Sequence, residues 1–133
     1  MSWGPSDIDQ AVVHDEIRGC FERYEQALMA NDVQALNDFF WQDGRVTRYG
    51  IADRQCGHEE LVAYRQSVPP PDFTRQLHGV RINTWGADMA VVMCEFTRSD
   101  TDLRGFQTQT WARLPEGWKI VSAHVSMIPW PAP

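Results

Sequence analysis

The sequence predicts an α+β fold in which three helices in the first half of the chain pack on a curved, mostly antiparallel sheet. In the first 40 residues, apolar side chains recur at steps of three and four, which is typical of helices, and from Asp43 the period changes to two. From residue 74 onward they alternate at a period of two, and short polar turns separate the segments, which favours antiparallel strands. A strongly twisted sheet wrapped around a long helix forms an open cone, and the mouth of that cone is a natural ligand cavity.

The first two helices are predicted from their caps and their apolar spacing. Ser6 and Asp7 are candidate N-caps of the first helix, and Asn31 tolerates the left-handed conformation that ends one. Asp32 can then cap a short second helix over residues 33–40. The apolar face of the first helix comprises Val13, Ile17, Cys20, Tyr24, Ala27 and Leu28.

The remaining elements follow from turn residues and strand alternation. A short hairpin is expected over residues 45–49 and 52–55, and a third helix over 57–66 ends before the proline run at 69–71. Four longer strands are predicted over residues 74–85, 89–98, 103–114 and 118–127. The length of the chain suits one domain, so residues 1–133 are expected to form a single unit.

Composition and charge disfavour several classes of partner. The net charge of −6 disfavours nucleic acid and anionic membrane surfaces, and no apolar run is long enough to span a bilayer. Cys20, Cys56 and Cys94 are an odd, widely spaced set, which favours a cytoplasmic protein without disulfides. Residues 1–5 show no basic region followed by an apolar run, so we expect no secretory signal. The sequence shows no metal-ligand spacing and no phosphate or dinucleotide motif, so we expect neither a metal nor a cofactor.

The basic residues are almost all arginine, with Lys119 the single lysine among the 12. Arginine suits bidentate recognition of carboxylates, although a coding bias would also produce this count. Arg48 alternates with Val46, so its side chain either points inward or caps the sheet edge. Arg75 is the second candidate for binding an anion, and further candidates are Arg45, Arg65 and Arg81.

Tyr24 lies on the apolar face of the first helix, seven residues after Ile17 and four before Leu28. A phenol inside a protein needs a partner for its hydroxyl, either the backbone or a ligand, and both alternatives stay open. A cation close to a phenol favours the phenolate. Tyr24 and Arg48 are therefore a candidate catalytic pair.

The last two predicted strands each carry a face that mixes aromatic and hydrogen-bonding side chains. Gln107, Gln109 and Trp111 share a face in one strand, and Ile120 and His124 share a face in the other. This mixture is typical of a polar pocket and also of a sheet surface that faces water. The candidate substrate-binding residues are Arg75, Gln109, Trp111 and His124.

Several sequence blocks carry a resemblance to a known family. They are residues 39–41 (Phe-Phe-Trp), 45–50 (Arg-Val-Thr-Arg-Tyr-Gly), 86–90 (Gly-Ala-Asp-Met-Ala), 107–111 (Gln-Thr-Gln-Thr-Trp), and 117–121 (Gly-Trp-Lys-Ile-Val) running into 123–126 (Ala-His-Val-Ser). The chain resembles the AtzH-like family, which includes the oxalurate-catabolism protein HpxZ. That family lies within the nuclear transport factor 2-like superfamily, together with ketosteroid isomerase and SnoaL cyclases. The resemblance implies the cystatin-like cone.

The resemblance also implies an activity without a cofactor. It implies a decarboxylating amidohydrolase that acts on a small carboxylated urea or ureide, such as 1,3-dicarboxyurea, to give allophanate. The setting would be nitrogen catabolism from s-triazines (cyanuric acid) or from purines through oxalurate. Tyr24 and Arg48 are the residues that the resemblance implies as catalytic. Relatives often have Gly-Arg-Gln-Ser-Gln where this chain has Phe106 in place of the arginine, which leaves the exact substrate open.

Two other functions remain open, and one expectation concerns assembly. The chain could be a non-catalytic protein that binds a small acid and supports a partner amidase. It could also be an isomerase like ketosteroid isomerase, which needs a carboxylate base in an apolar cavity. Glu95 shares strand parity with Val91 and Met93 and is the candidate for that base. The expected partners are a small anionic substrate and, because one sheet face would lie open, a second copy in a homodimer or homotetramer.

Overall fold

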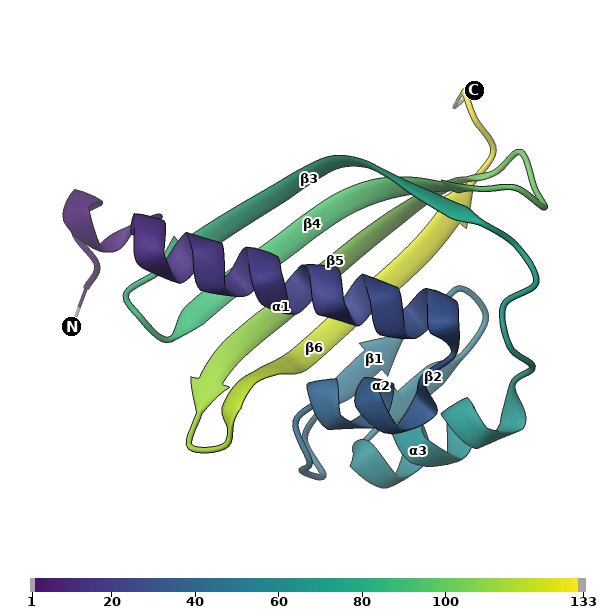
Figure 1. The fold of residues 1–133 in the computed structure, drawn as a ribbon, viewed down its shortest axis with the longest axis horizontal. Coiled ribbons are helices and arrows are strands. Elements are labelled where there is room, and N and C mark those ends of the chain that lie inside the picture. The colour runs from purple at the N-terminus through teal and green to yellow at the C-terminus, as the bar shows by residue number, and fades with distance from the viewer. Residues whose placement is uncertain (1, 132–133) are drawn as a thin grey trace.

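The computed structural model describes residues 2–131, which form three α-helices and a six-stranded sheet. After a short 3₁₀ helix, η1 (Pro5–Asp7), the α-helices are α1 (Ala11–Ala30), α2 (Val33–Phe39) and α3 (His58–Ser67). The strands are β1 (Thr47–Tyr49), β2 (Arg54–Cys56), β3 (Arg75–Trp85), β4 (Met89–Arg98), β5 (Arg104–Leu114) and β6 (Gly117–Ile128). Figure 1 shows α1 running across the sheet, with α2 and α3 beside its C-terminal end.

The strand order is β2-β1-β6-β5-β4-β3. Neighbouring strands are antiparallel except β1 and β6, which are parallel and align Arg48 with Ala123. The predicted α+β architecture, with three helices on a curved and mostly antiparallel sheet, is confirmed. The parallel pair brings the early hairpin into the sheet beside the last strand (Figure 1), and Arg48 of this hairpin lines the same cavity as Tyr24 of α1.

Helix α1 begins at Ala11 and not at the predicted cap, Asp7. Asp9 adopts a left-handed conformation with φ 57°, which separates η1 from α1. The Asp9 carboxylate accepts hydrogen bonds from the backbone N–H of Thr84 at 2.8 Å and from the side chain of Asn83 at 3.0 Å. These early acids therefore do not cap α1, because Asp9 instead ties the N-terminal segment to β3.

The turn between α1 and α2 agrees with the prediction. Asn31 is left-handed, with φ 52°, and the Asp32 carboxylate caps α2. As a result α2 folds back and brings two rings edge-on to Tyr24. The centroid distances from Tyr24 are 5.8 Å to Phe39 and 6.2 Å to Phe40, which is a favourable arrangement for aromatic pairs.

Strand β6 contains a β-bulge that the sequence pattern does not reveal. Thr110 of β5 pairs with Ser122, but the next residue, Trp111, pairs with Ile120, so Val121 is an extra residue in β6. An extra residue inverts the alternation of side chains in the rest of the strand. The face predicted for residues 118–126 is therefore divided at the bulge.

The core lies between α1 and the concave face of the sheet. Its largest fully buried side chains include Trp111, Phe40, Phe96, Ile17 and Leu36. None of the helices formed by residues 2–131 combines the length and apolar character needed to cross a membrane.

Candidate active site

A cavity of about 340 Å³ opens between the C-terminal half of α1, the hairpin β1–β2, helix α3, the start of β3 and the end of β4. Its size suits a small ligand. The charged side chains that line it are Arg48, Arg65, Arg75, Arg98 and Asp72. A chain with a net charge of −6 therefore surrounds this cavity mainly with cations.

Tyr24 lines the cavity from α1 and is only 4% exposed. Its ring packs against Phe39 and Phe40, and none of the side-chain hydrogen bonds among residues 2–131 involves its hydroxyl. The sequence left open whether the backbone accepts a hydrogen bond from this hydroxyl. The structure shows no such hydrogen bond among residues 2–131. The hydroxyl is therefore free to bond a ligand.

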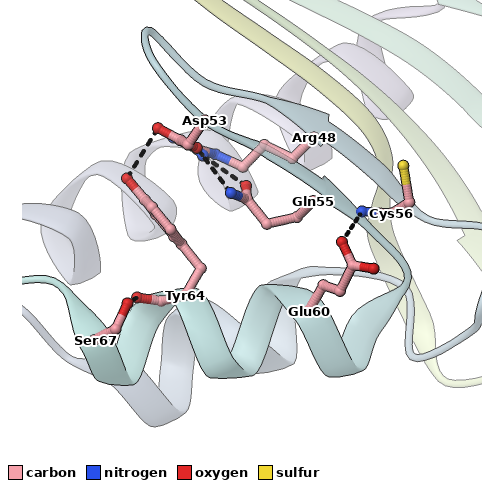
Figure 2. Close-up of polar contacts among 7 residues, drawn as sticks. All are labelled: Arg48, Asp53, Gln55, Cys56, Glu60, Tyr64 and Ser67. Atoms are coloured by element: carbon pink, nitrogen blue, oxygen red, sulfur yellow. Dashed lines mark hydrogen bonds and ion pairs between the residues drawn. The ribbon is translucent and has the colours of Figure 1, made fainter.

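Arg48 is held by a polar network inside the hairpin, which Figure 2 shows. Its Nη1 donates to Asp53 Oδ1 and to Gln55 Oε1, both at 2.9 Å. The Tyr64 hydroxyl donates to Asp53 Oδ2 at 3.2 Å, and its ring centroid lies 5.3 Å from the guanidinium carbon of Arg48. Within residues 2–131 the hydrogen bonds of Arg48 both come from Nη1, so the edge of its fork formed by Nε and Nη2 can receive a carboxylate.

The Asp53 carboxylate anchors this network. Burial opposes its ionisation, but hydrogen bonds from Gln55, Tyr64 and Arg48, with the charge of Arg48, hold its pKa below the ordinary value. Gly50 makes the arrangement possible, because a Cβ there would overlap the Asp53 carboxylate. The backbone N–H of Gly50 also donates to the Asp53 carbonyl at 2.9 Å. The hairpin turn therefore positions Arg48.

Arg75 reaches the same cavity from the start of β3, with its side chain only 7% exposed. Its Nη2 donates to Glu25 Oε1 at 3.1 Å and to Gln107 Oε1 at 2.5 Å. Its guanidinium carbon lies 4.0 Å from the centroid of the Phe96 ring, a cation–π distance. Phe96 can lie there because Gly105, on the next strand, has no side chain to meet its ring.

Glu25 is a residue of the site that sequence reasoning did not single out. Burial raises the pKa of Glu25, while the charge of Arg75 and a hydrogen bond from Gln107 oppose that rise. The two partners lie 50 and 82 residues away in the chain. No local pattern could signal these contacts, because they depend on how α1 crosses the sheet.

With this geometry established, comparison with known proteins assigns the family. The family model described as AtzH-like matches residues 6–130. The chain belongs to the AtzH-like family. No curated protein sequence matches it significantly.

Several solved structures are similar to this AtzH-like chain over most of its length. A protein with unknown function from Pectobacterium atrosepticum is 43% identical with a TM-score of 0.93, and covers 96% of this chain and 99% of its own. A cystatin-like fold protein from Burkholderia xenovorans is 44% identical with a TM-score of 0.90, and covers 93% of this chain and 98% of its own. A nuclear transport factor 2-like protein of unknown function from Pseudomonas putida shares the fold. It is 15% identical with a TM-score of 0.77, and the match covers 93% of this chain and 99% of that protein.

Two predicted binding residues of the AtzH-like protein lie in the core and do not line the cavity. Trp111 is fully buried and its indole N–H donates to Gln109 Oε1 at 3.1 Å. Gln107 lines the cavity in place of Gln109. Two residues along a strand correspond to about 7 Å, so the same face of β5 reaches the cavity at one position and the core at the next.

Two further candidates lie on the opposite face of the sheet. The bulge at Val121 turns His124 to the outer face, where it pairs with Thr108, so the expectation that His124 orients substrate in the cavity is corrected. Glu95 also lies on that face and forms an ion pair with Arg104 at 3.0 Å, with 43% of its side chain exposed. The predicted location of Glu95 in an apolar cavity is therefore wrong.

The departure from the family pattern at Phe106 also lies outside the cavity of the AtzH-like protein. Phe106 pairs with Ser126 and its ring centroid lies 6.3 Å from that of Trp130. It has the parity of the outward-facing residues of β5, so an arginine at this position would not line the cavity. The cations of the cavity come instead from the hairpin, α3, β3 and β4.

Proposed function

We propose that this AtzH-like protein is a cofactor-free, decarboxylating amidohydrolase that converts a small carboxylated urea, such as 1,3-dicarboxyurea, to allophanate. The observation that carries the proposal is the pairing of an unpartnered phenol with a cation on one cavity. Tyr24 and Arg48 both line it, and among residues 2–131 the hydrogen bonds of Arg48 use only Nη1 and none involves the Tyr24 hydroxyl. Neither group requires a metal or an organic cofactor to bind an acid or to transfer a proton.

Arg48 would bind the carboxylate that leaves. Its Nη1 is occupied by Asp53 and Gln55, so Nε and Nη2 supply the donors for a bidentate contact. Because Asp53 holds the guanidinium in place before substrate arrives, little conformational freedom is lost on binding.

Tyr24 would act as the general acid. As the bond between the urea nitrogen and the carboxyl carbon breaks, its electron pair stays on the nitrogen and carbon dioxide leaves. The nitrogen takes the proton of the Tyr24 hydroxyl, and the phenolate then regains a proton from water. The net reaction consumes one proton and releases one carbon dioxide.

We further propose a cytoplasmic setting, in nitrogen catabolism from s-triazines or oxalurate. The free thiols of Cys20, Cys56 and Cys94 support this location, since unpaired cysteines are typical of reducing compartments.

The test is turnover of freshly prepared 1,3-dicarboxyurea, followed by carbon dioxide release and by mass spectrometry of allophanate. Carboxylated ureas lose carbon dioxide unaided, so the rate without protein is subtracted. Oxalurate and allophanate serve as comparison substrates. We expect acceleration with dicarboxyurea; thermal stabilisation by that compound without acceleration would identify a binding protein instead. The absence of both acceleration and stabilisation would refute the substrate class.

A further inference from the structure

Arg65 is a cavity-lining cation that the proposed reaction does not use. It lies in the last turn of α3, and its Nε and Nη2 are buried without a hydrogen-bond partner in residues 2–131. The other three arginines of the cavity each form an ion pair, with Asp53, Glu25 or Asp100. Within the described part of the chain, Arg65 has no such carboxylate.

Buried guanidinium nitrogens without acceptors are costly, and they can only donate. The group that satisfies them must therefore supply acceptors, and an anion does so best because it also neutralises the charge. Nε of Arg75 is a third buried donor without a partner among residues 2–131. Two arginines on one cavity thus share the same deficit of acceptors.

The position of Arg65 relative to Arg48 limits the size of the ligand. Their guanidinium carbons lie 6.0 Å and 5.3 Å from the centroid of the same ring, that of Tyr64. The two carbons therefore lie no more than 11.3 Å apart, the sum of those distances. The carboxyl carbons of 1,3-dicarboxyurea are roughly 5 Å apart, and each guanidinium would add about 4 Å in a paired geometry. An in-line arrangement would need about 13 Å, so a dicarboxylate with three atoms between its carboxyl groups contacts both arginines in a bent arrangement.

We propose that Arg65 binds the second carboxylate of a dianionic ligand and makes the cavity selective for dianions over monoanions. The inference rests on the proposed function, in which Arg48 and Tyr24 act on the first carboxylate. The consequence is discrimination between substrate and product. Dicarboxyurea engages both arginines, whereas allophanate has lost the carboxylate that Arg48 held and binds through Arg65 alone.

Equilibrium binding of two unreactive acids tests the inference. Glutarate has three carbon atoms between its two carboxyl groups. Butyrate has the same three-carbon chain but only one carboxyl group. By calorimetry, the wild type is expected to bind glutarate at least roughly tenfold more tightly than butyrate, as one charged hydrogen-bonded pair allows. Arg65→Gln should abolish that preference. Arg54→Gln, which removes an exposed arginine of β2, should keep it.

Equal affinity of the wild type for the two acids, or an unchanged preference in Arg65→Gln, would overturn the inference. Should Arg65→Gln fail to fold, Arg65→Lys replaces it, and a severalfold weaker preference is expected because lysine cannot donate as a fork. The outcome is independent of turnover. A preference for glutarate that depends on Arg65, without any decarboxylation of dicarboxyurea, would support the inference and refute the proposed function.

Discussion

Replacing Tyr24 by phenylalanine separates a catalytic hydroxyl from a structural one. None of the hydrogen bonds among residues 2–131 involves this hydroxyl, and the ring contacts with Phe39 and Phe40 survive the change. Loss of a bonded hydroxyl would reduce the free energy of unfolding by about 1 kcal/mol. Because the Tyr24 hydroxyl makes no such bond, we expect Tyr24→Phe to change the free energy of unfolding by less than about 0.5 kcal/mol.

The rate should respond very differently. A general acid contributes about 10²- to 10⁴-fold, so its removal raises the activation free energy by roughly 3 to 5 kcal/mol. The assay is the initial rate of carbon dioxide release from dicarboxyurea, measured on the same preparations as unfolding by urea. Tyr49→Phe is the matched control, because Tyr49 is 46% exposed and does not line the cavity. It should change neither quantity.

Two results would refute this reasoning about Tyr24. Turnover in Tyr24→Phe equal to that of the wild type would remove the hydroxyl from the mechanism. A fall in unfolding free energy of about 1 kcal/mol or more would show that the hydroxyl has a bonding partner in the folded protein, contrary to the geometry of the cavity.

Four further predictions concern packing, titration and assembly. Gly105→Ala should destabilise the protein by about 1 to 3 kcal/mol in urea unfolding, because its methyl group meets the Phe96 ring; an unchanged midpoint would contradict that packing. The raised pKa of Glu25 means that the wild type should lose stability relative to Glu25→Gln as the pH rises above 4.5. The lowered pKa of Asp53 has the opposite consequence: the wild type should lose its greater stability over Asp53→Asn as the pH falls through 3.8 and below. Urea unfolding across this pH range measures the sign of both effects. We also propose that two copies pair through the outer sheet face, where Met93 is 50% exposed, so Met93→Glu should lower the mass found by sedimentation equilibrium, and a wild-type monomer would exclude the pairing.

Local pattern was enough to predict the elements and to select three side chains that line the candidate cavity. Helical spacing turned Tyr24 toward the core, whereas strand alternation left Arg48 either inward or at the sheet edge, and both line the cavity with Arg75. These features depend on neighbours a few residues away, through side-chain direction, capping and turn geometry. The caps at Asn31 and Asp32 were predictable for the same reason.

The sequence by itself therefore determined the α+β fold, the order of its elements and the meeting of a phenol with arginines. Tertiary structure decided the rest. The bulge at Val121 moved His124 to the outer face, the crossing of α1 brought Glu25 to Arg75, and the end of α3 left Arg65 without an acceptor in the described chain. Each of these depends on the register between strands, or on contacts between segments far apart in sequence, and alternation along a single strand carries no information about either.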